Sequence, residues 1–274
     1  MMPGRLRKAI VAPATMRGIV AVVTFILLWE IGSKSKQWFG VQTPWVGQVP
    51  APSDVVRVWI GLLADAGYWQ SWYLSSLRVL GGFVAAMIVG IPFGLLLAVS
   101  RTAYGTCFPT FEVLRPIPPL AWVPASIIFW PTQELSIGFV TFLGAFFPVV
   151  INVLGGAKSI DVRYFQAARS MGASSWDVFR RITLPAVIPS IAVGSAVGMG
   201  ITWNVVVAAE MISGGGSQSA GAGGGLGFFI WNSYVGGSYN QIVIGMISIG
   251  IAGYISSSVL RKLGEISTPW LRSR

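Results

Sequence analysis

Side chains that commonly carry chemistry are scarce in this sequence of 274 residues. It contains no histidine, a single cysteine at Cys107, and nine acidic residues against 19 lysines and arginines. Zinc and haem sites, Cys–His nucleophiles, iron–sulfur clusters and internal disulfides all require more His or Cys than that. The phosphate-binding string G-x-x-x-x-G-K-[ST] is also absent, since the nearest string, at 155–159, has the wrong spacing. The sequence therefore predicts no catalytic residue, no metal site and no cofactor or ATP site in this chain.

The composition is that of a protein embedded in lipid. Hydrophobic residues make up 54% of the chain and charged residues 10%, and the mean hydropathy is +0.69. Soluble domains carry about 25% charged residues, so this chain has too few charges to cover a surface that faces water. The sequence predicts an integral membrane protein and excludes the disordered, fibrous and disulfide-rich classes.

Six apolar stretches approach the length of about 20 residues that crosses a bilayer as a helix. They lie at 18–32, 79–99, 107–130, 135–154, 184–212 and 242–260, and they predict an all-α polytopic fold of about six transmembrane helices. The first resembles a signal peptide, but Lys34 and Lys36 stand where a cleavage site would be, so we expect it to be retained. The third contains five prolines and should therefore kink, or begin as a short helix at the interface.

The basic residues indicate the orientation. With the N-terminus inside, 14 of the 19 fall in inner segments and three in outer loops, in agreement with the positive-inside rule. Six spans then place both termini in the cytoplasm, and the net charge of +10 reflects topology rather than a nucleic-acid partner. The predicted organisation is a cytoplasmic tail at 1–17 and one transmembrane domain at 18–274, which contains an extracytoplasmic segment (34–72), a cytoplasmic loop (155–183) and a glycine-rich extracytoplasmic loop (213–238).

The extracytoplasmic segment should contain one short helix. Residues 55–63 have amphipathic spacing, and Ser53 or Asp54 could cap the helix that contains them. Such a helix can lie on the membrane surface or pack as an ordinary helix. The sequence leaves both interpretations open.

The cytoplasmic loop has the pattern of two short helices joined at a glycine. Asp161 can cap the first helix, and Gly172 can supply the left-handed residue that ends it. Ser174 or Ser175 can then cap the second helix. The small residues Ala167 and Ala168 would let a partner protein approach closely, so the loop could transmit motion to the spans. An ordinary interfacial hairpin is the alternative.

This loop resembles the cytoplasmic EAA loop of ABC importer permeases, whose pattern is E-A-A-x-x-x-G followed after a spacer by hydrophobic-x-L-P. The chain has Q-A-A-R-S-M-G at 166–172 and I-T-L-P at 182–185. Gln166 replaces the family's glutamate, so a charge contact with the partner would be lost while a hydrogen bond could survive.

Further strings resemble those of the nitrate, sulfonate, taurine and bicarbonate permeases. They are R-P-I-P-P-L-A-W-V-P at 115–124, F-F-P-V-V-I-N at 146–152, Trp203 with V-A-A-E-M at 207–211, and G-L-G-F-F-I-W at 225–231. The resemblance covers roughly residues 50–260. None of these strings is specific for one substrate.

The resemblance implies the type I ABC importer permease fold and a place in the inner (plasma) membrane. It also implies partners: a second permease copy, two cytoplasmic ABC ATPases that hold ATP and Mg, an extracytoplasmic substrate-binding protein and membrane lipid. The residues implied to couple the chain to the ATPases are Arg163, Gln166, Ala167, Ala168, Arg169, Met171, Gly172, Leu184 and Pro185.

The implied substrates are small anions, with nitrate or a related inorganic oxyanion first and sulfonates or taurine as the alternative. An intramembrane anion site would use helix N-termini, hydroxyls, amides and one arginine. The candidate pathway residues are Arg115, Asn152, Thr202, Trp203, Asn204 and Glu210. Glu112 could neutralise Arg115 on the same helix face. Glu210 better suits a structural hydrogen bond or a gate, because a carboxylate repels anions.

A channel and a secondary transporter are the alternative function classes. A channel would need a filter such as T-V-G-Y-G, and a secondary transporter usually shows internal repeats, but the sequence contains neither.

The glycine-rich stretch 214–227 could form part of an outer gate or a contact for the binding protein, with a flexible spacer as the alternative.

Overall fold

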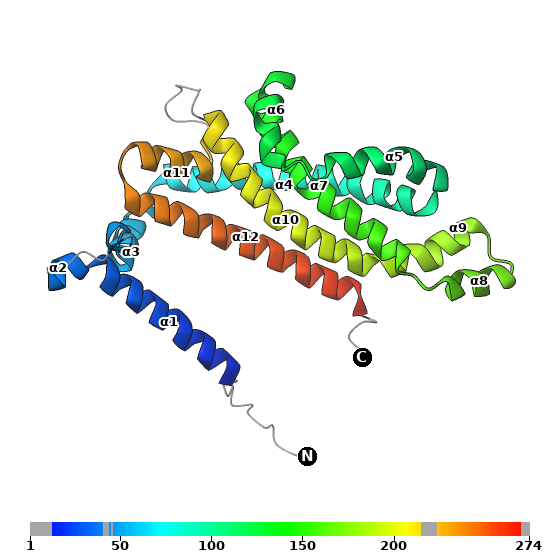
Figure 1. Cartoon of the computed structure of the whole chain (residues 1–274), viewed down its shortest axis with the longest axis horizontal. Helices are drawn as coiled ribbons and strands as arrows, with labels where there is room; N and C mark the ends of the chain where they lie inside the picture. Colours follow the sequence, from blue (N-terminus) through cyan, green and yellow to red (C-terminus); the bar gives the residue numbers. More distant parts are fainter. Residues whose placement is uncertain (1–12, 41–43, 45, 215–223, 270–274) are drawn as a thin grey trace, which may run out of the picture.

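The computed structural model describes residues 13–40, 44, 46–214 and 224–269, and within these ranges every regular element is a helix. The predicted all-α class is therefore confirmed. The helices are α1 (Pro13–Ser33), α2 (Ser35–Phe39), α3 (Pro52–Leu62), α4 (Ala66–Val99), α5 (Arg101–Leu114), α6 (Val123–Phe129), α7 (Gln133–Lys158), α8 (Val162–Ser170), α9 (Ser175–Val178), α10 (Leu184–Gly214), α11 (Leu226–Val235) and α12 (Tyr239–Ser267), as Figure 1 shows.

Within the described parts of the chain, five helices are long and apolar enough to cross a membrane: α1, α4, α7, α10 and α12. They correspond to five of the six predicted stretches, although α4 begins at Ala66 rather than at Val79. The remaining stretch, 107–130, is divided between α5, a 3₁₀ turn at Pro119–Trp122 and α6. Prolines lack the N–H group that a continuous helix requires, which explains this predicted break.

The helices α4, α7, α10 and α12 pack along one another and form the centre of the bundle (Figure 1). One end of this bundle carries α8 and α9, and we call it the elbow end. The C-terminal ends of α4, α7 and α12 and the N-terminal end of α10 lie toward it, and the opposite end is the far end. Apolar residues such as Val79, Val140 and Val206 are buried between the helices.

Glycines let α7 and α10 approach each other closely. A methyl group added at Gly194 would lie 2.8 Å from Cβ of Asn152, and one added at Gly198 would lie 3.2 Å from Cα of Ala145. Small residues at such crossings allow backbone contact in membrane proteins. The pair α7–α10 is therefore tightly packed along much of its length.

Two adjacent glycines of α4 provide a test of this packing. A methyl group at Gly82 would lie 2.2 Å from the Thr141 hydroxyl oxygen and 2.9 Å from the backbone nitrogen of Phe142, whereas Gly81 has nothing within 4 Å. We expect Gly82→Ala to destabilise the fold by about 1–3 kcal/mol, since overpacking forces the backbone to shift. Gly81→Ala should leave the midpoint of thermal unfolding in detergent unchanged or slightly raised. Equal midpoints for the two variants would contradict the packing of α4 against α7.

The helix α3 is not capped as predicted. Its N-cap is Ala51 rather than Ser53 or Asp54, and Pro52 occupies the first helical position. The Ser53 backbone N–H and hydroxyl instead donate to the Glu30 carboxylate of α1 at 3.0 and 2.8 Å. A carboxylate from another helix can satisfy free N–H groups at a helix start as well as a local cap does.

The contacts of α3 support the interpretation as a packing helix. Val55 is buried against α4 and α12, together with Tyr68 and Ile244. Trp59 donates its ring N–H to the Tyr68 hydroxyl at 3.0 Å, and this hydroxyl lies 2.8 Å from the Ser248 hydroxyl. The helix α3 is thus joined to the far end of the bundle.

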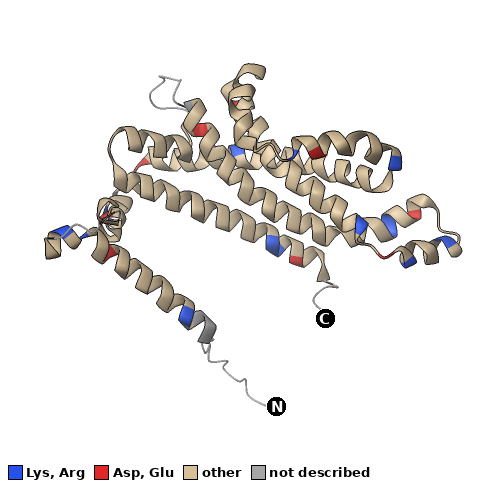
Figure 2. Cartoon of the chain, in the orientation of Figure 1, with Lys and Arg blue, Asp and Glu red and all other residues tan. Residues whose placement is uncertain are grey.

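Figure 2 shows how the charged residues are distributed over the helices. Many basic residues gather toward the elbow end, at Arg101, Lys158, the α8–α9 region and the pair Arg261–Lys262. This distribution agrees with the charge pattern from which the sequence predicts a cytoplasmic elbow.

Candidate functional site

The predicted two-helix loop is present at 160–183, and we call it the elbow. Asp161 is the N-cap of α8 and accepts the backbone N–H of Arg163 at 2.9 Å. Ser174 is the N-cap of α9, and its hydroxyl and backbone form a capping box with Asp177. Capping boxes fix the helix start because each partner satisfies a free N–H of the other. Both predicted caps are therefore confirmed.

Gly172 ends α8 in the left-handed conformation, with φ of +82°. The Gly172 N–H donates to the carbonyl of Arg169 at 3.0 Å, and the Ala173 N–H donates to that of Ala168 at 3.0 Å. This pair of bonds is a Schellman motif, in which the residue at the Gly172 position requires positive φ. The turn between α8 and α9 consequently depends on a glycine at 172.

The elbow exposes most of the predicted coupling residues. Arg163, Gln166, Ala167, Arg169, Met171 and Gly172 are exposed, whereas Ala168 is buried. Large apolar side chains are also exposed here, among them Tyr164, Trp176 and Met171, the last with 82% of its surface accessible. An exposed apolar surface on a short loop is typical of a protein contact.

The elbow is joined to the bundle through continuous helical backbone. A π-helical turn at Phe179–Thr183 links α9 directly to α10, so the chain runs from Ser175 to Gly214 without a break in the helical backbone. Leu184 and Pro185 are half-buried at the start of α10. Any displacement of α9 therefore moves the elbow end of α10.

Two predicted pathway residues, Arg115 and Asn152, line the same pocket. This cavity of about 300 Å³ lies between the Pro119 turn, α7 and α10, and its other lining residues are mostly apolar. Arg115 donates to Glu112 at 2.6 Å, as predicted from their spacing, and the Asn152 amide donates to the Pro148 carbonyl at 2.8 Å. A guanidinium and an amide in an apolar cavity can bind a small anion.

The other predicted pathway residues lie elsewhere. Thr202 is buried and donates to the Gly198 carbonyl at 2.9 Å, while Trp203 is buried against α12 and donates to the Ser256 hydroxyl at 3.0 Å. Asn204 is exposed on the surface of α10. The structure therefore does not bring all six candidates into one site.

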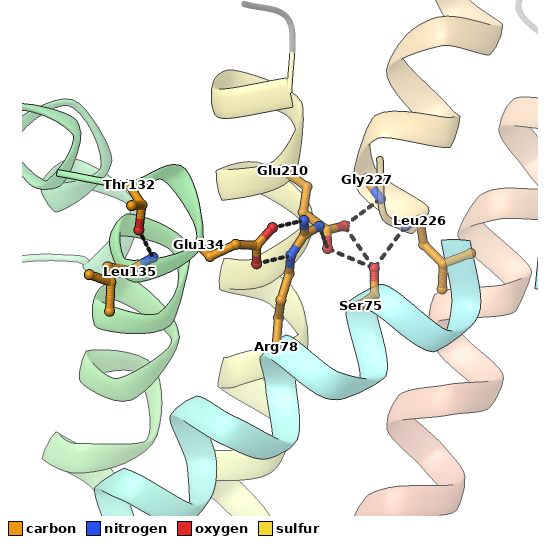
Figure 3. A network of polar contacts seen from close by, with 8 residues as sticks. All are labelled: Ser75, Arg78, Thr132, Glu134, Leu135, Glu210, Leu226 and Gly227. Atoms are coloured by element: carbon orange, nitrogen blue, oxygen red, sulfur yellow. Dashed lines mark hydrogen bonds and ion pairs between the residues drawn. The ribbon is translucent and has the colours of Figure 1, made fainter. Parts of the chain in front are cut away.

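Glu210 belongs to a buried polar network at the far end, drawn in Figure 3. Arg78 of α4 donates through Nη1 to Glu210 of α10 at 2.9 Å and through Nε to Glu134 of α7 at 2.9 Å. A second bond joins Nη2 of Arg78 to the same Glu134 carboxylate. One guanidinium thus connects three helices of the bundle.

The same network fixes the start of α11. The Ser75 hydroxyl donates to the Glu210 carboxylate at 2.8 Å, and Glu210 also accepts the backbone N–H of Gly227 at 2.9 Å. The Leu226 N–H donates to the Ser75 oxygen at 2.8 Å. A methyl group on Gly225 would lie 2.0 Å from a Glu210 oxygen, so the carboxylate needs glycine here.

This arrangement bears on two sequence interpretations. Glu210 makes the structural hydrogen bonds that the sequence suggests as one of its two possible roles. The described tail of the glycine-rich stretch, 224–227, packs onto the bundle, with Leu226 completely buried. Residues 215–223 lie outside the described residues, so the hypothesis of an outer gate or binding-protein contact stays a prediction there.

Sequence reasoning missed the roles of Arg78 and Glu134. The signal was available in part, because a charged residue in or beside an apolar span usually has an oppositely charged partner. Arg78 precedes one predicted span and Glu210 lies inside another. Their pairing could have been proposed, but Glu134 could not have been recognised without the helix packing. Among the residues that the structure describes, no group of three or more His, Cys, Asp or Glu could hold a metal ion.

Residues 90–273 match the family described as the binding-protein-dependent transport system inner membrane component. The nitrate import permease protein NrtB of Synechocystis is 32% identical over 95% of this chain and 92% of its own length. The taurine permease TauC of Escherichia coli is 31% identical over 81% of this chain and 80% of its own length. The bicarbonate permease CmpB of Synechococcus elongatus is 33% identical over 86% of this chain and 84% of its own length.

Solved structures agree with the fold. A chain of the MetNI methionine ABC transporter, in an inward facing conformation, has a TM-score of 0.56 and 21% identity, covering 73% of this chain and 94% of that chain. The expected permease fold is therefore confirmed. Together with the family match, the bundle and its five long apolar helices show that this chain is a multi-pass ABC importer permease of the binding-protein-dependent transport system inner membrane component family.

Proposed function

We propose that the chain is the transmembrane subunit of an ABC importer for a small oxyanion, with nitrate as the leading substrate. Two copies enclose the translocation pathway in the inner membrane, and both termini and the elbow face the cytoplasm. Two ABC ATPases bind the elbows and hydrolyse ATP with Mg, while an extracytoplasmic binding protein delivers the substrate. The chain itself has no ATPase site and is not an enzyme.

The observation that carries this proposal is the exposed elbow, which continues into the long span α10 without a break in the helical backbone and follows α7 after a short link. Val162, Tyr164, Met171 and Trp176 present apolar surface outside the bundle, and the basic residues at the same end favour the cytoplasmic side. The groove of an ATPase is a partner of the right kind, because the helix α8 offers small residues for close approach and apolar residues for burial.

The continuous junction between α9 and α10 suggests how ATP drives the pathway. When two ATPases close on ATP, the two bound elbows are drawn together. The continuous backbone from α9 into α10, and the short link from α7 to α8, then carry that displacement into the spans. The pathway opens outward, and hydrolysis resets it.

The relatives support a small anion as the substrate, but they do not distinguish between nitrate, taurine and bicarbonate. The nitrate permease of Synechocystis aligns over larger shares of both chains than the taurine and bicarbonate permeases do, whereas that of Leptolyngbya laminosa aligns over smaller shares. Identities of 31–33% are nevertheless too similar to decide among the three. An aliphatic sulfonate or taurine is the alternative substrate, and TauC supports it.

The substrate is tested by titrating the cognate binding protein with nitrate, bicarbonate, sulfate and taurine in a calorimeter. The proposal predicts the tightest binding for nitrate. Tighter binding of taurine would transfer the assignment to sulfonates. Transport by the permease without any ATPase would instead favour a channel or a secondary transporter.

The pocket of Arg115 and Asn152 supplies a prediction about the anion. Arg115→Gln should lower the maximal rate of uptake about tenfold or more, because a hydrogen bond to a charged group contributes about 1.5–3 kcal/mol. Glu112→Gln should not lower it, since that change removes the carboxylate that competes for the guanidinium. Uptake with both variants, measured with saturating binding protein, separates these outcomes. If both variants transport like wild type, the pocket is not on the pathway.

A further inference from the structure

The two helices that flank the elbow each bring a carboxylate to the same guanidinium. Glu134 lies at the start of α7 and Glu210 near the end of α10, and both bind Arg78 of α4 (Figure 3). The elbow lies at the other ends of α7 and α10. With 26 residues, α7 is about 39 Å long at 1.5 Å per residue. The far-end network is thus linked to the elbow through two long helices.

The two halves of this network differ in how easily they can separate. The side chain of Glu210 is 1% exposed, and it also holds Ser75 and the N-terminus of α11. The side chain of Glu134 is 63% exposed although its carboxylate binds the buried Arg78. If the Arg78 guanidinium separates from Glu134, the Glu134 carboxylate returns to water and Arg78 stays paired with Glu210. Separation from Glu210 would leave a buried charge without its partner, which is far more costly.

We propose that the Arg78–Glu134 ion pair is a reversible latch at the extracytoplasmic end of the permease. It is closed in the resting state and opens when α7 moves relative to α4 during transport. The Arg78–Glu210 pair stays closed throughout and keeps α4, α10 and α11 together. The latch rests on the proposed function, because it requires a cycle that is driven from the elbow.

A latch of this kind makes a specific prediction for ATP hydrolysis. While it is closed it favours the resting state, so the ATPases wait for a loaded binding protein. Without it, the resting state loses stability and the ATPases cycle unprompted. Because Glu134 is exposed to water and Arg78 keeps its second partner, we expect the pair to contribute about as modestly as a surface ion pair, and therefore a change of severalfold rather than complete uncoupling.

The test uses the whole importer in proteoliposomes. Glu134→Gln should raise the ATPase rate measured without binding protein about two- to fivefold, with little change in the rate at saturating binding protein. The midpoint of thermal unfolding should stay close to wild type. Asp54→Asn is the matched control, because it removes a negative charge at the far end outside the network. An unchanged basal rate in Glu134→Gln would overturn the latch.

A second experiment asks whether the charge itself closes the latch. In a Cys107→Ser background, Glu134→Cys is treated with a methanethiosulfonate reagent that adds either a sulfonate or a trimethylammonium group. The sulfonate should restore the low basal ATPase rate and the cation should not. Equal effects of the two reagents would contradict the latch while leaving the importer intact. If the wild-type complex does not respond to binding protein at all, the proposed function fails and the latch with it.

Discussion

Replacing Gly172 with valine is expected to lower substrate uptake about tenfold or more while the chain still folds and inserts. Gly172 has φ of +82°, and an added Cβ would meet nothing within 4 Å. The substitution therefore costs conformational free energy rather than causing a steric clash. An L-residue in the left-handed backbone region costs about 1–2 kcal/mol, and a β-branched side chain costs more. Relief of that strain turns α8 away from its position, so the ATPase loses its contact. Uptake into proteoliposomes and retention of the ATPase on the purified permease measure the effect.

A matched glycine at the other end of the molecule provides the control. Gly40 ends α2 with φ of +72° and also has nothing within 4 Å of an added Cβ. Gly40→Val introduces the same kind of strain outside the elbow, so it should leave ATPase retention intact. Gly172→Asn should keep part of the activity, because asparagine tolerates the left-handed region. Wild-type uptake by Gly172→Val would remove the elbow from the coupling mechanism.

The second large effect is expected at Glu210, where alanine should destabilise the permease by about 3–5 kcal/mol. The change leaves the Arg78 guanidinium, whose side chain is 5% exposed, without its buried partner. It also removes the acceptor of the Gly227 N–H at the start of α11. The amount of folded protein in the membrane and the midpoint of thermal unfolding in detergent should both fall.

An exposed ion pair elsewhere in the chain sets the scale for this loss. Glu112 binds Arg115 at 2.6 Å, but both side chains are about two-fifths exposed. Glu112→Ala should cost only about 0–1 kcal/mol, as surface ion pairs usually do. If Glu210→Ala proves no less stable than Glu112→Ala, the buried network does not hold the far end together.

Local signals in the sequence were sufficient for the elbow. The caps at Asp161 and Ser174 and the left-handed Gly172 each depend on residues within a few positions of one another. Apolar length likewise predicted the long spans, because burial in lipid imposes a minimum number of residues. The clustered prolines near 116–119 predicted that one stretch would break, since their effect on the backbone is also local.

Features that depend on packing between helices were not predictable in the same way. The Glu30 carboxylate replaces a local cap at α3 from 23 residues away, and Arg78 reaches Glu134 across 56 residues and Glu210 across 132. Thr202 and Trp203 have residue types that suit a polar pathway, yet both are buried in contacts between helices. Residue type alone does not indicate which face of a span meets its neighbours. The helix packing is needed for that.

The most direct test of the central claim compares uptake by two kinds of proteoliposome, one with the purified permease alone and one with its ATPase as well. Both receive loaded binding protein outside and ATP inside. The account predicts uptake only when the ATPase is present, and its loss when a non-hydrolysable nucleotide replaces ATP. Concentrative or downhill uptake by the permease alone would contradict it.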